Sequence, residues 1–267
     1  LELGDFSQAI KEYSQLDNRS ILEQTGVSTY QRIGVCYASL GKFAAAIEFL
    51  EKAVELEHDD AAVYELATIL ADQEEYQKAN LYFKQLDTLS LEGYEYGYAL
   101  SLHAEHRTAE ALTLAQQGLA KNPFETRLLL LASQLSYELH DEKAAEHYLL
   151  QAQEDADDLE EIALRLTTLY LEQERYEDIL EFAEQEVDNA LTRWNLARAY
   201  QALENLEKAE ELYNQLAREL HDNPEFLEQY VYLLRELGRF EEAKRAAASY
   251  LRLVPDDASM QELYESL

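Results

Sequence analysis

The chain contains 267 residues, with 54 acidic and 22 basic side chains, and its formal net charge is −32. A nucleic-acid backbone or an anionic membrane surface needs basic side chains to neutralise it, so this charge argues against both partners. The single cysteine cannot form an internal disulfide or a thiolate metal cage, and we expect a cytoplasmic protein.

The composition and the apolar spacing both predict an all-α protein. Only three prolines and eight glycines interrupt the chain, and these are the two strongest breakers of a helix. Val63, Leu66, Ala67 and Leu70 lie at i, i+3, i+4 and i+7, which places them on one face of a helix. No stretch shows sustained alternation of apolar and polar residues, so we expect no sheet.

A short pattern recurs along the chain: a turn, an aromatic residue, a small residue three positions later, and then a large apolar residue. Gly41, Phe43 and Ala46 are one example, and Gly238, Phe240 and Ala243 are another. The small residues serve as anchors of the repeat and are separated by 30 to 37 residues. These anchors are Ala9, Ala46, Ala79, Ala111, Ala145, Ile179, Ala209 and Ala243.

A period near 34 residues has room for two helices and two short turns. One such pair cannot bury its apolar stripe alone, so successive pairs must stack. Alanine suits an anchor because it lets two helix backbones cross closely. Pro123 and Pro255 each follow an anchor by twelve residues, where a proline would end the second helix.

The chain resembles the tetratricopeptide repeat family. Three sets of residues carry the resemblance: Gly34, Tyr37, Gly41, Phe43, Ala46 and Ala53; Trp194, Leu196, Tyr200, Ala209 and Tyr213; and Gly238, Phe240, Ala243 and Pro255. The resemblance implies a right-handed superhelix of stacked helix pairs, whose inner surface is formed mainly by the first helix of each pair.

In chain order, residues 1–18 are expected to form the second helix of an incomplete repeat. Seven repeats then fill residues 27–257, with starts near 27, 60, 92, 126, 160, 190 and 224. Residues 258–267 form a terminal amphipathic helical segment. Two departures from the pattern stand out, because Ile179 replaces the anchor alanine and His106 stands where the turn glycine is expected.

The inner surface is the candidate binding site. We place it one residue beyond the packed stripe of each first helix, which selects 21 positions, here called the inner stripe. Only one of these is acidic, where the composition predicts about four. The candidate partner-binding residues on it are Tyr64, Thr68, Tyr96, Leu100, Leu130, Tyr137, Leu164, Leu171, Trp194, Arg198, Tyr232 and Arg235.

These residues predict a non-enzymatic scaffold that binds a protein or peptide segment in a concave groove, because tyrosine, tryptophan and arginine dominate such contacts. The alternative for each residue is packing against neighbouring repeats. Two further functions stay open: a structural protein that self-assembles, as a homo-oligomer, through the open N-terminal end, or the regulatory repeat portion of a larger protein.

The run from Gly93 to Tyr98 contains two glycines four residues apart. Its glycines allow either close approach of a ligand chain or tight packing against the preceding helix, and packing is the favoured interpretation. The run does not match a phosphate-binding loop.

No catalytic, cofactor or metal site is predicted. His103 and His106 have a spacing that a metal could use, but no third ligand is near them in sequence. Cys36 lies in an apolar stretch and is expected to be a buried thiol. Asn195 with Arg198 is a weak match to the clamp that holds a partner's terminal carboxylate in some tetratricopeptide domains.

Overall fold

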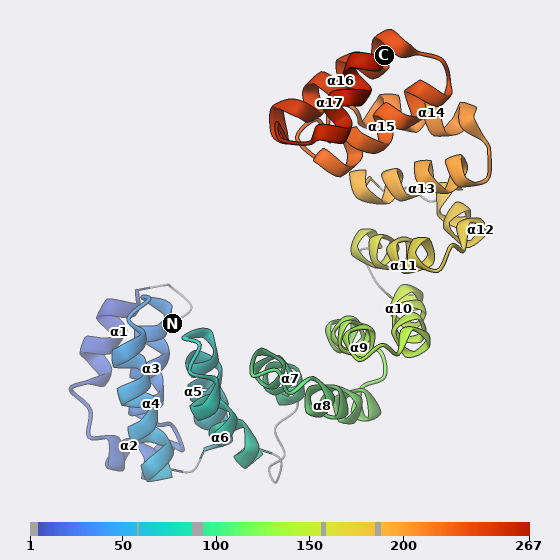
Figure 1. Cartoon of the computed structure of the whole chain (residues 1–267). Coiled ribbons are helices and arrows are strands. Elements are labelled where there is room, and N and C mark those ends of the chain that lie inside the picture. Colours follow the sequence, from blue (N-terminus) through green and yellow to red (C-terminus); the bar gives the residue numbers. More distant parts are fainter. Residues whose placement is uncertain (1–4, 58, 87–92, 156–158, 185–187) are drawn as a thin grey trace. The chain divides into compact units, whose positions relative to one another are not determined.

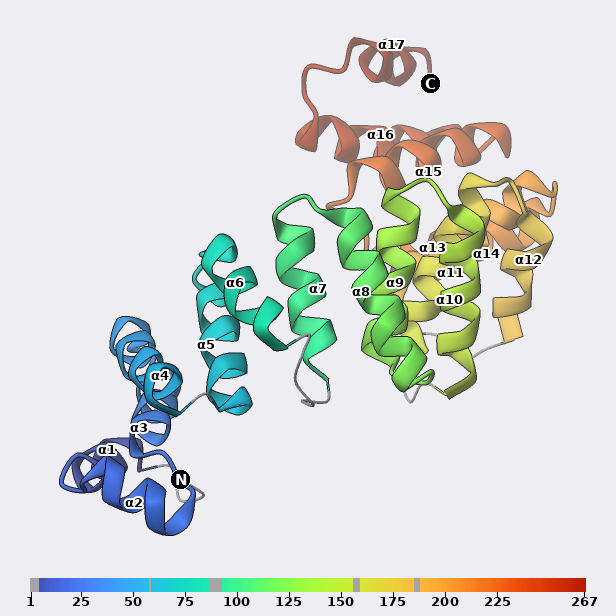
Figure 2. The same ribbon diagram turned by 90° about the horizontal axis from the view of Figure 1, so that it is seen from below.

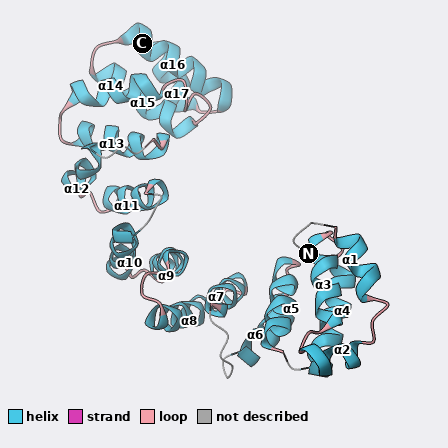
Figure 3. Cartoon of the chain, turned by 180° about the vertical axis from the view of Figure 1, so that it is seen from behind, coloured by secondary structure: helices cyan, strands magenta, loops and turns pink. Residues whose placement is uncertain are grey.

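The computed structural model describes residues 5–57, 59–86, 93–155, 159–184 and 188–267. Every regular element in these ranges is helical and none is a strand, so the prediction of an all-α fold is confirmed (Figure 3). The chain divides into two compact units, residues 1–148 and 149–267, which are described separately.

The helices follow one another with short connections (Figure 1). Unit 1 contains α1 (Phe6–Tyr13), α2 (Asn18–Thr25), α3 (Thr29–Ser39), α4 (Phe43–Glu57), α5 (Asp60–Asp72), α6 (Tyr76–Leu86), α7 (Tyr94–Ala104), α8 (Thr108–Lys121) and α9 (Thr126–Glu138). The division falls within α10 (Glu142–Asp155). Unit 2 contains α11 (Glu160–Glu172), α12 (Tyr176–Leu180), the 3₁₀ helix η1 (Glu181–Glu184), α13 (Ala190–Ala202), α14 (Leu206–Leu216), α15 (Pro224–Glu236), α16 (Phe240–Leu253) and α17 (Ala258–Ser266).

Each helix packs mainly against its neighbours in sequence. In unit 1, α3 to α9 form a continuous series of adjacent helices, and the first helices α3, α5, α7 and α9 also touch in succession (Figure 2). In unit 2, α11 contacts α13, and α13 to α17 again pack in chain order. This nearest-neighbour packing is typical of a solenoid, in which each pair needs the next one to bury its apolar face.

A left-handed turn after the first helix recurs seven times. In each turn, one residue has φ between 57° and 72°. The backbone N–H of the residue after it donates to a carbonyl oxygen five positions before that donor, at 2.8 to 3.0 Å. This hydrogen bond ends the helix and reverses the chain. Five of the seven positions hold a residue other than glycine, His106 among them. The seven are Gly41, Glu74, His106, His140, Glu174, Glu204 and Gly238.

The anchors lie where helices cross closely. All seven anchors other than Ala9 are buried, and each has no more than 1% of its surface exposed. Ile179 occupies the same kind of site in α12 and is also fully buried. That pair is the short one in sequence, and its second helix continues beyond Leu180 as the 3₁₀ helix η1.

The N-terminal region differs from the expectation of one helix over residues 1–18. Within the described residues, α1 ends at Tyr13 and a further helix, α2, begins at Asn18. The Asp17 carboxylate caps α2, and Asn18 Oδ1 accepts hydrogen bonds from the backbone N–H and the hydroxyl of Thr29 at 2.8 and 2.7 Å. These bonds fix α2 against the start of α3.

The C-terminal segment forms α17, which covers the apolar core of unit 2. Met260 is buried, and Leu263, Tyr264 and Leu267 are partly buried against the same core. Asp257 holds the start of this helix, because its carboxylate accepts from the Met260 backbone N–H at 3.0 Å and from the Tyr250 hydroxyl at 2.8 Å.

A buried carboxylate joins α7 to α8. Glu95 is 2% exposed and pairs with the Lys121 ammonium, which also lies over the Tyr94 ring. We expect Lys121→Met to lower the free energy of unfolding of unit 1 by about 2 kcal/mol, because it leaves Glu95 unpaired. Urea titration followed by far-UV circular dichroism measures this loss.

The control for this prediction is Lys52→Met, since the Lys52–Glu48 pair is solvent-exposed and such pairs contribute about 0.5 kcal/mol. Adding Glu95→Gln to Lys121→Met should recover part of the loss. Equal losses from Lys121→Met and Lys52→Met would show that the burial of Glu95 does not matter.

Candidate partner-binding surface

In unit 1 the candidate partner-binding residues lie on three adjacent first helices, α5, α7 and α9. Tyr64 and Thr68 on α5 are half-buried, and the Thr68 hydroxyl donates to the Tyr64 carbonyl oxygen at 2.9 Å. On α7, Tyr96 is half-buried and Leu100 is exposed. On α9, Leu130 is half-buried and Tyr137 is exposed. On α7 and α9, therefore, the candidate residue nearer the C-terminal end of the helix is the more exposed one.

An arginine outside the predicted set joins this surface. The Arg127 guanidinium lies 5.0 Å from the Tyr96 ring centroid and pairs with Glu125 at 3.0 Å. Its positive charge on the ring face is a cation–π contact. Sequence reasoning missed Arg127 because it follows the connection into α9 and lies outside the helical spacing used to select the stripe.

The glycine run of α7 is a packing feature. A Cβ added at Gly97 would lie 3.5 Å from the Phe83 ring and 3.6 Å from the Tyr64 hydroxyl, so this face of α7 meets the preceding helix pair. Gly93 has φ 83° and precedes the first residue of α7. The contacts therefore agree with the packing interpretation of this run.

In unit 2, Trp194 is a core residue. Its side chain is 6% exposed, and its ring meets the Phe226 ring edge-to-face with centroids 5.8 Å apart. The inner-stripe spacing predicted that Trp194 lies on the binding surface. In the structure, its indole extends from α13 and packs against Phe226 of α15. Arg198, one turn later, places its guanidinium 5.5 Å from the centroid of the Trp194 ring.

Three predicted residues of unit 2 meet at one hollow of about 450 Å³, here called the Arg198 hollow. Leu171 comes from α11, Arg198 from α13 and Tyr232 from α15, which are the first helices of three successive pairs. Tyr232 is 43% exposed, whereas Leu171 and Arg198 are half-buried. Tyr176, Gln201, Ala202 and Gln229 complete the lining.

The other predicted residues of unit 2 lie outside this lining. Leu164, near the start of α11, is half-buried, and Arg235, near the end of α15, is exposed. The candidate residues of unit 2 therefore fall into three groups. Trp194 is buried in the core, Leu171, Arg198 and Tyr232 line the hollow, and Leu164 and Arg235 lie outside it.

The polar groups of the hollow are held by a buried tyrosine. The Tyr213 hydroxyl donates toward Gln229 Oε1 at 3.2 Å and, more weakly, toward Gln201 Oε1 at 3.5 Å. Burial raises the pKa of Tyr213 to about 12, so its hydroxyl stays protonated at neutral pH. Both carboxamides therefore turn their oxygen toward Tyr213.

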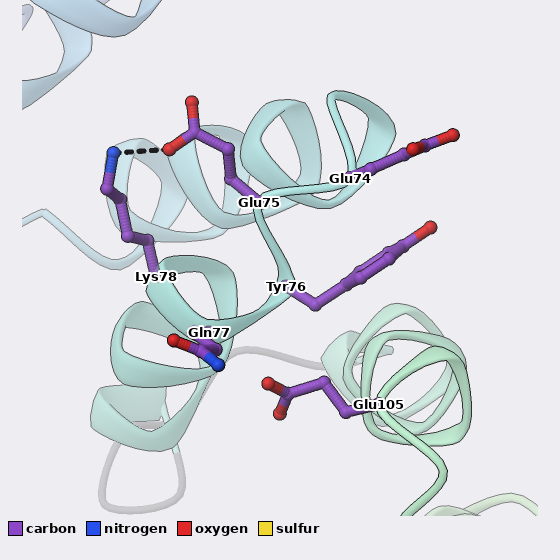
Figure 4. Close-up of a pocket in the computed structure, with 6 residues that line it drawn as sticks. All are labelled: Glu74, Glu75, Tyr76, Gln77, Lys78 and Glu105. Carbon is purple, nitrogen blue, oxygen red and sulfur yellow. Dashed lines mark hydrogen bonds and ion pairs between the residues drawn. The ribbon is translucent and has the colours of Figure 1, made fainter.

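Unit 1 has a different hollow, of about 470 Å³, at the turn between α5 and α6 (Figure 4). Glu74 and Tyr76 extend side by side, Glu75 pairs with Lys78, and Glu105 reaches in from the end of α7. Glu105 already accepts from the Asn80 side-chain amide at 2.5 Å and from Arg107 at 3.4 Å. Its carboxylate thus joins α6 to the turn that follows α7.

The remaining candidates of the sequence have structural contacts. His103 Nε2 lies 2.7 Å from Glu138 Oε2 and links α7 to α9, while His106 occupies a left-handed turn. Burial raises the pKa of the Cys36 thiol. Within the described ranges, no group of three or more His, Cys, Asp or Glu residues could hold a metal ion, and no helix is long and apolar enough to cross a membrane.

Comparison with known proteins gives matches at both ends of the chain. The family model described as tetratricopeptide repeat matches residues 27–60, and the one described as YpiA-like, C-terminal tetratricopeptide repeats, matches residues 191–257. The TPR repeat-containing protein YpiA of Bacillus subtilis is 25% identical over 99% of this chain. The chain spans 63% of the length of that relative.

Two solved structures have a similar fold. A tetratricopeptide repeat protein from Parabacteroides merdae has a TM-score of 0.57 at 15% identity, covering 97% of this chain and 98% of its own. PilF of Pseudomonas aeruginosa has a TM-score of 0.56 at 20% identity, covering 71% of this chain and 89% of its own. At such identities the likeness concerns the fold alone.

Proposed function

Because the chain carries tetratricopeptide repeats, which generally mediate contacts between proteins, we propose that it is a non-enzymatic scaffold that binds a segment of a partner polypeptide. The binding surface is formed by the first helices of the pairs. The observation that carries the proposal is the Arg198 hollow, where side chains from α11, α13 and α15 converge.

The chemistry of the hollow suits a peptide. Leu171, Tyr176 and Tyr232 offer apolar area, and the aromatic rings give large contact at low conformational cost. Arg198 and the two glutamines supply hydrogen-bond donors for backbone carbonyls or polar side chains. A hollow of this size admits one or two side chains of a bound segment, whose neighbours would lie along the adjacent helices.

Unit 1 carries a candidate contact surface of its own. Tyr96 with Arg127 against its ring forms a flat, half-exposed platform, and Leu100 lies exposed one turn further along α7. Tyrosine and arginine are the residue types that dominate binding energy at protein interfaces. We infer that this platform contacts the same class of ligand as the hollow.

The experiment is selection of random peptides displayed on phage against the full chain, followed by affinity measurement with synthetic copies. We expect Tyr96→Ala with Tyr232→Ala to weaken binding by about tenfold or more, since each removes a large aromatic contact from the proposed surface. Trp194→Ala is unsuitable as a test because Trp194 is buried in the core.

The control variant is Phe124→Ala with Phe240→Ala, two exposed aromatic residues that lie outside the inner stripe. It should leave the affinity unchanged. Recovery of no specific peptide, or equal loss from both double variants, would contradict the proposed surface.

A second candidate function is self-assembly through α1. This helix has an amphipathic sequence, yet none of its residues is buried, and Phe6, Ile10 and Tyr13 are only half-covered. A second copy could cover them. Light scattering coupled to size exclusion tests this, and a monomer mass at every concentration would contradict it.

A further inference from the structure

The Arg198 hollow is lined by hydrogen-bond donors and contains no carboxylate, although the chain has 54 acidic residues. From this geometry we propose that the hollow binds an acidic side chain, aspartate or glutamate, of the partner segment. The inference rests on the proposed function and specifies what the bound segment must contain.

The first support is the state of Arg198. Four arginines of unit 2 are half-buried within the described ranges. Three of them bind carboxylates: Arg165 with Glu161 at 2.5 Å, Arg175 with Asp178 at 2.5 Å, and Arg193 with Glu219 at 2.8 Å. The fourth, Arg198, has no carboxylate partner among the residues that the structure describes, and its guanidinium lies against Trp194.

A half-buried guanidinium without a counter-charge favours binding of an anion. Its donors have a fork geometry that matches the two oxygens of a carboxylate. The guanidinium packs against the Trp194 ring, which restrains its orientation, and Arg198 lines the hollow. An incoming carboxylate would therefore find the donors already oriented, which lowers the conformational cost of binding.

The second support is the orientation of the two glutamines. Because the Oε1 atoms of Gln201 and Gln229 accept from Tyr213, each NH₂ group lies on the opposite side of its carboxamide. Neither NH₂ group has an acceptor within the described part of the chain. Together with Arg198 they give a set of donors, and a carboxylate is the side-chain group that only accepts.

The walls of the hollow fit the aliphatic part of an acidic side chain. Leu171, Tyr176 and Tyr232 offer apolar surface on the walls of the hollow, against which the methylene groups of aspartate or glutamate can pack. Salt at physiological strength screens the charges of carboxylates that lie farther than about 8 Å from the hollow, so those carboxylates oppose an acidic segment only weakly. The local donors therefore decide the preference.

An acidic group can also come from the C-terminus of a partner. A terminal carboxylate bound by Arg198 would need a second donor, and the nearby amide of Asn195 is the candidate. However, Asn195 Nδ2 donates to the hydroxyls of Thr167 and Thr168 at 3.1 and 3.2 Å. This amide is thus engaged away from the hollow. We expect an internal acidic side chain to be the preferred source, and the experiment compares the two.

The chain itself provides the reporter. Trp194 is the only tryptophan, so its indole N–H gives one resolved signal in a ¹⁵N–¹H spectrum, next to Arg198. The probes are blocked heptapeptides of alternating alanine and leucine with glutamate, glutamine or lysine at the centre. A fourth probe has glutamine at the centre and a free C-terminal carboxylate.

We expect the glutamate probe to shift the indole signal with an affinity about 10- to 100-fold higher than the glutamine and lysine probes, as for a charge-assisted hydrogen bond. Arg198→Gln should remove this preference, and Arg198→Lys should keep part of it. Arg245→Gln, an exposed arginine of the second helix α16 that lies outside both the lining and the inner stripe, should retain the full preference. Far-UV circular dichroism verifies that the variants remain helical.

Equal binding of the glutamate, glutamine and lysine probes, a preference that survives in Arg198→Gln, or no shift with any probe would overturn the inference. A terminal-carboxylate probe that binds better than the glutamate probe would also overturn it. The proposed function fails separately, when no displayed peptide depends on Tyr96 and Tyr232. Selected peptides without acidic residues would leave that function standing and reject the acidic ligand.

Discussion

Phe226→Ala is expected to lower the free energy of unfolding of unit 2 by about 3 to 5 kcal/mol, the range for removing a fully buried aromatic side chain. Phe226 has no exposed surface. Its ring centroid lies 5.8 Å from Trp194, 5.4 Å from Tyr213 and 5.8 Å from Tyr230. Truncation would therefore leave a cavity between α13, α14 and α15 and remove several ring contacts.

Urea titration followed by tryptophan fluorescence measures this effect in unit 2 alone, since Trp194 is the only tryptophan and touches Phe226. Unfolding of a repeat protein is often not a single transition, so a local reporter is needed. Phe240→Ala is the matched control, because Phe240 is 52% exposed and its loss should change stability by less than about 1 kcal/mol. Similar shifts of the two midpoints would contradict the assigned core.

The second large effect is stabilising. Replacing all five non-glycine residues at the left-handed turns with glycine should raise the free energy of unfolding by about 3 kcal/mol in total. The substitutions are Glu74→Gly, His106→Gly, His140→Gly, Glu174→Gly and Glu204→Gly. Side chains with a Cβ are strained at φ near +60°, whereas glycine adopts this conformation freely. The gain is reduced, but not cancelled, by the greater freedom of glycine in the unfolded chain.

Thermal and urea unfolding followed by far-UV circular dichroism measure the gain over both units. Gly41→Ala and Gly238→Ala should each have the opposite effect, a loss of about 1 kcal/mol, because they introduce the same strain. Glu211→Gly is the helical control: this exposed residue lies inside α14, where glycine costs about 1 kcal/mol. A loss on Glu204→Gly as large as that on Glu211→Gly would refute the strain at the turns.

The left-handed turns can be located from the anchors in the sequence, but not from its glycines. Each left-handed residue lies five positions before an anchor, from Gly41 before Ala46 to Gly238 before Ala243. The anchors alone therefore locate all seven turns. A search for glycine finds only two of them, because hydrogen bonding and packing impose the turn conformation on His and Glu as well.

The candidate site was predictable in part. Helical spacing selected Leu171, Arg198 and Tyr232, and the structure places all three around one hollow. The same spacing selected Trp194, which is buried because its large ring reaches the next helix pair and packs on Phe226. Spacing gives the direction of a side chain from its own helix, but not how far a neighbouring helix covers it.

Three residues of the proposed surfaces lie outside the helical spacing that was used to select the stripe. Tyr176 and Arg127 lie next to turns, so their positions depend on how the chain reverses. Gln229 lies on a first helix but outside the stripe, and it lines the hollow beside Tyr232. Its orientation follows from Tyr213, which belongs to another helix and is sixteen residues away.

By itself the sequence determined the all-α class, the period of about 34 residues and the small buried anchors. Those properties follow from helical periodicity and from the fact that a single helix pair cannot bury its apolar face. Only the tertiary structure decided which side chains of the inner stripe remain exposed and that Arg198 lies in a hollow without a carboxylate among the described residues. The exposure of these side chains and the surroundings of Arg198 depend on distances between helices that are far apart in sequence. Local residue spacing cannot predict those distances.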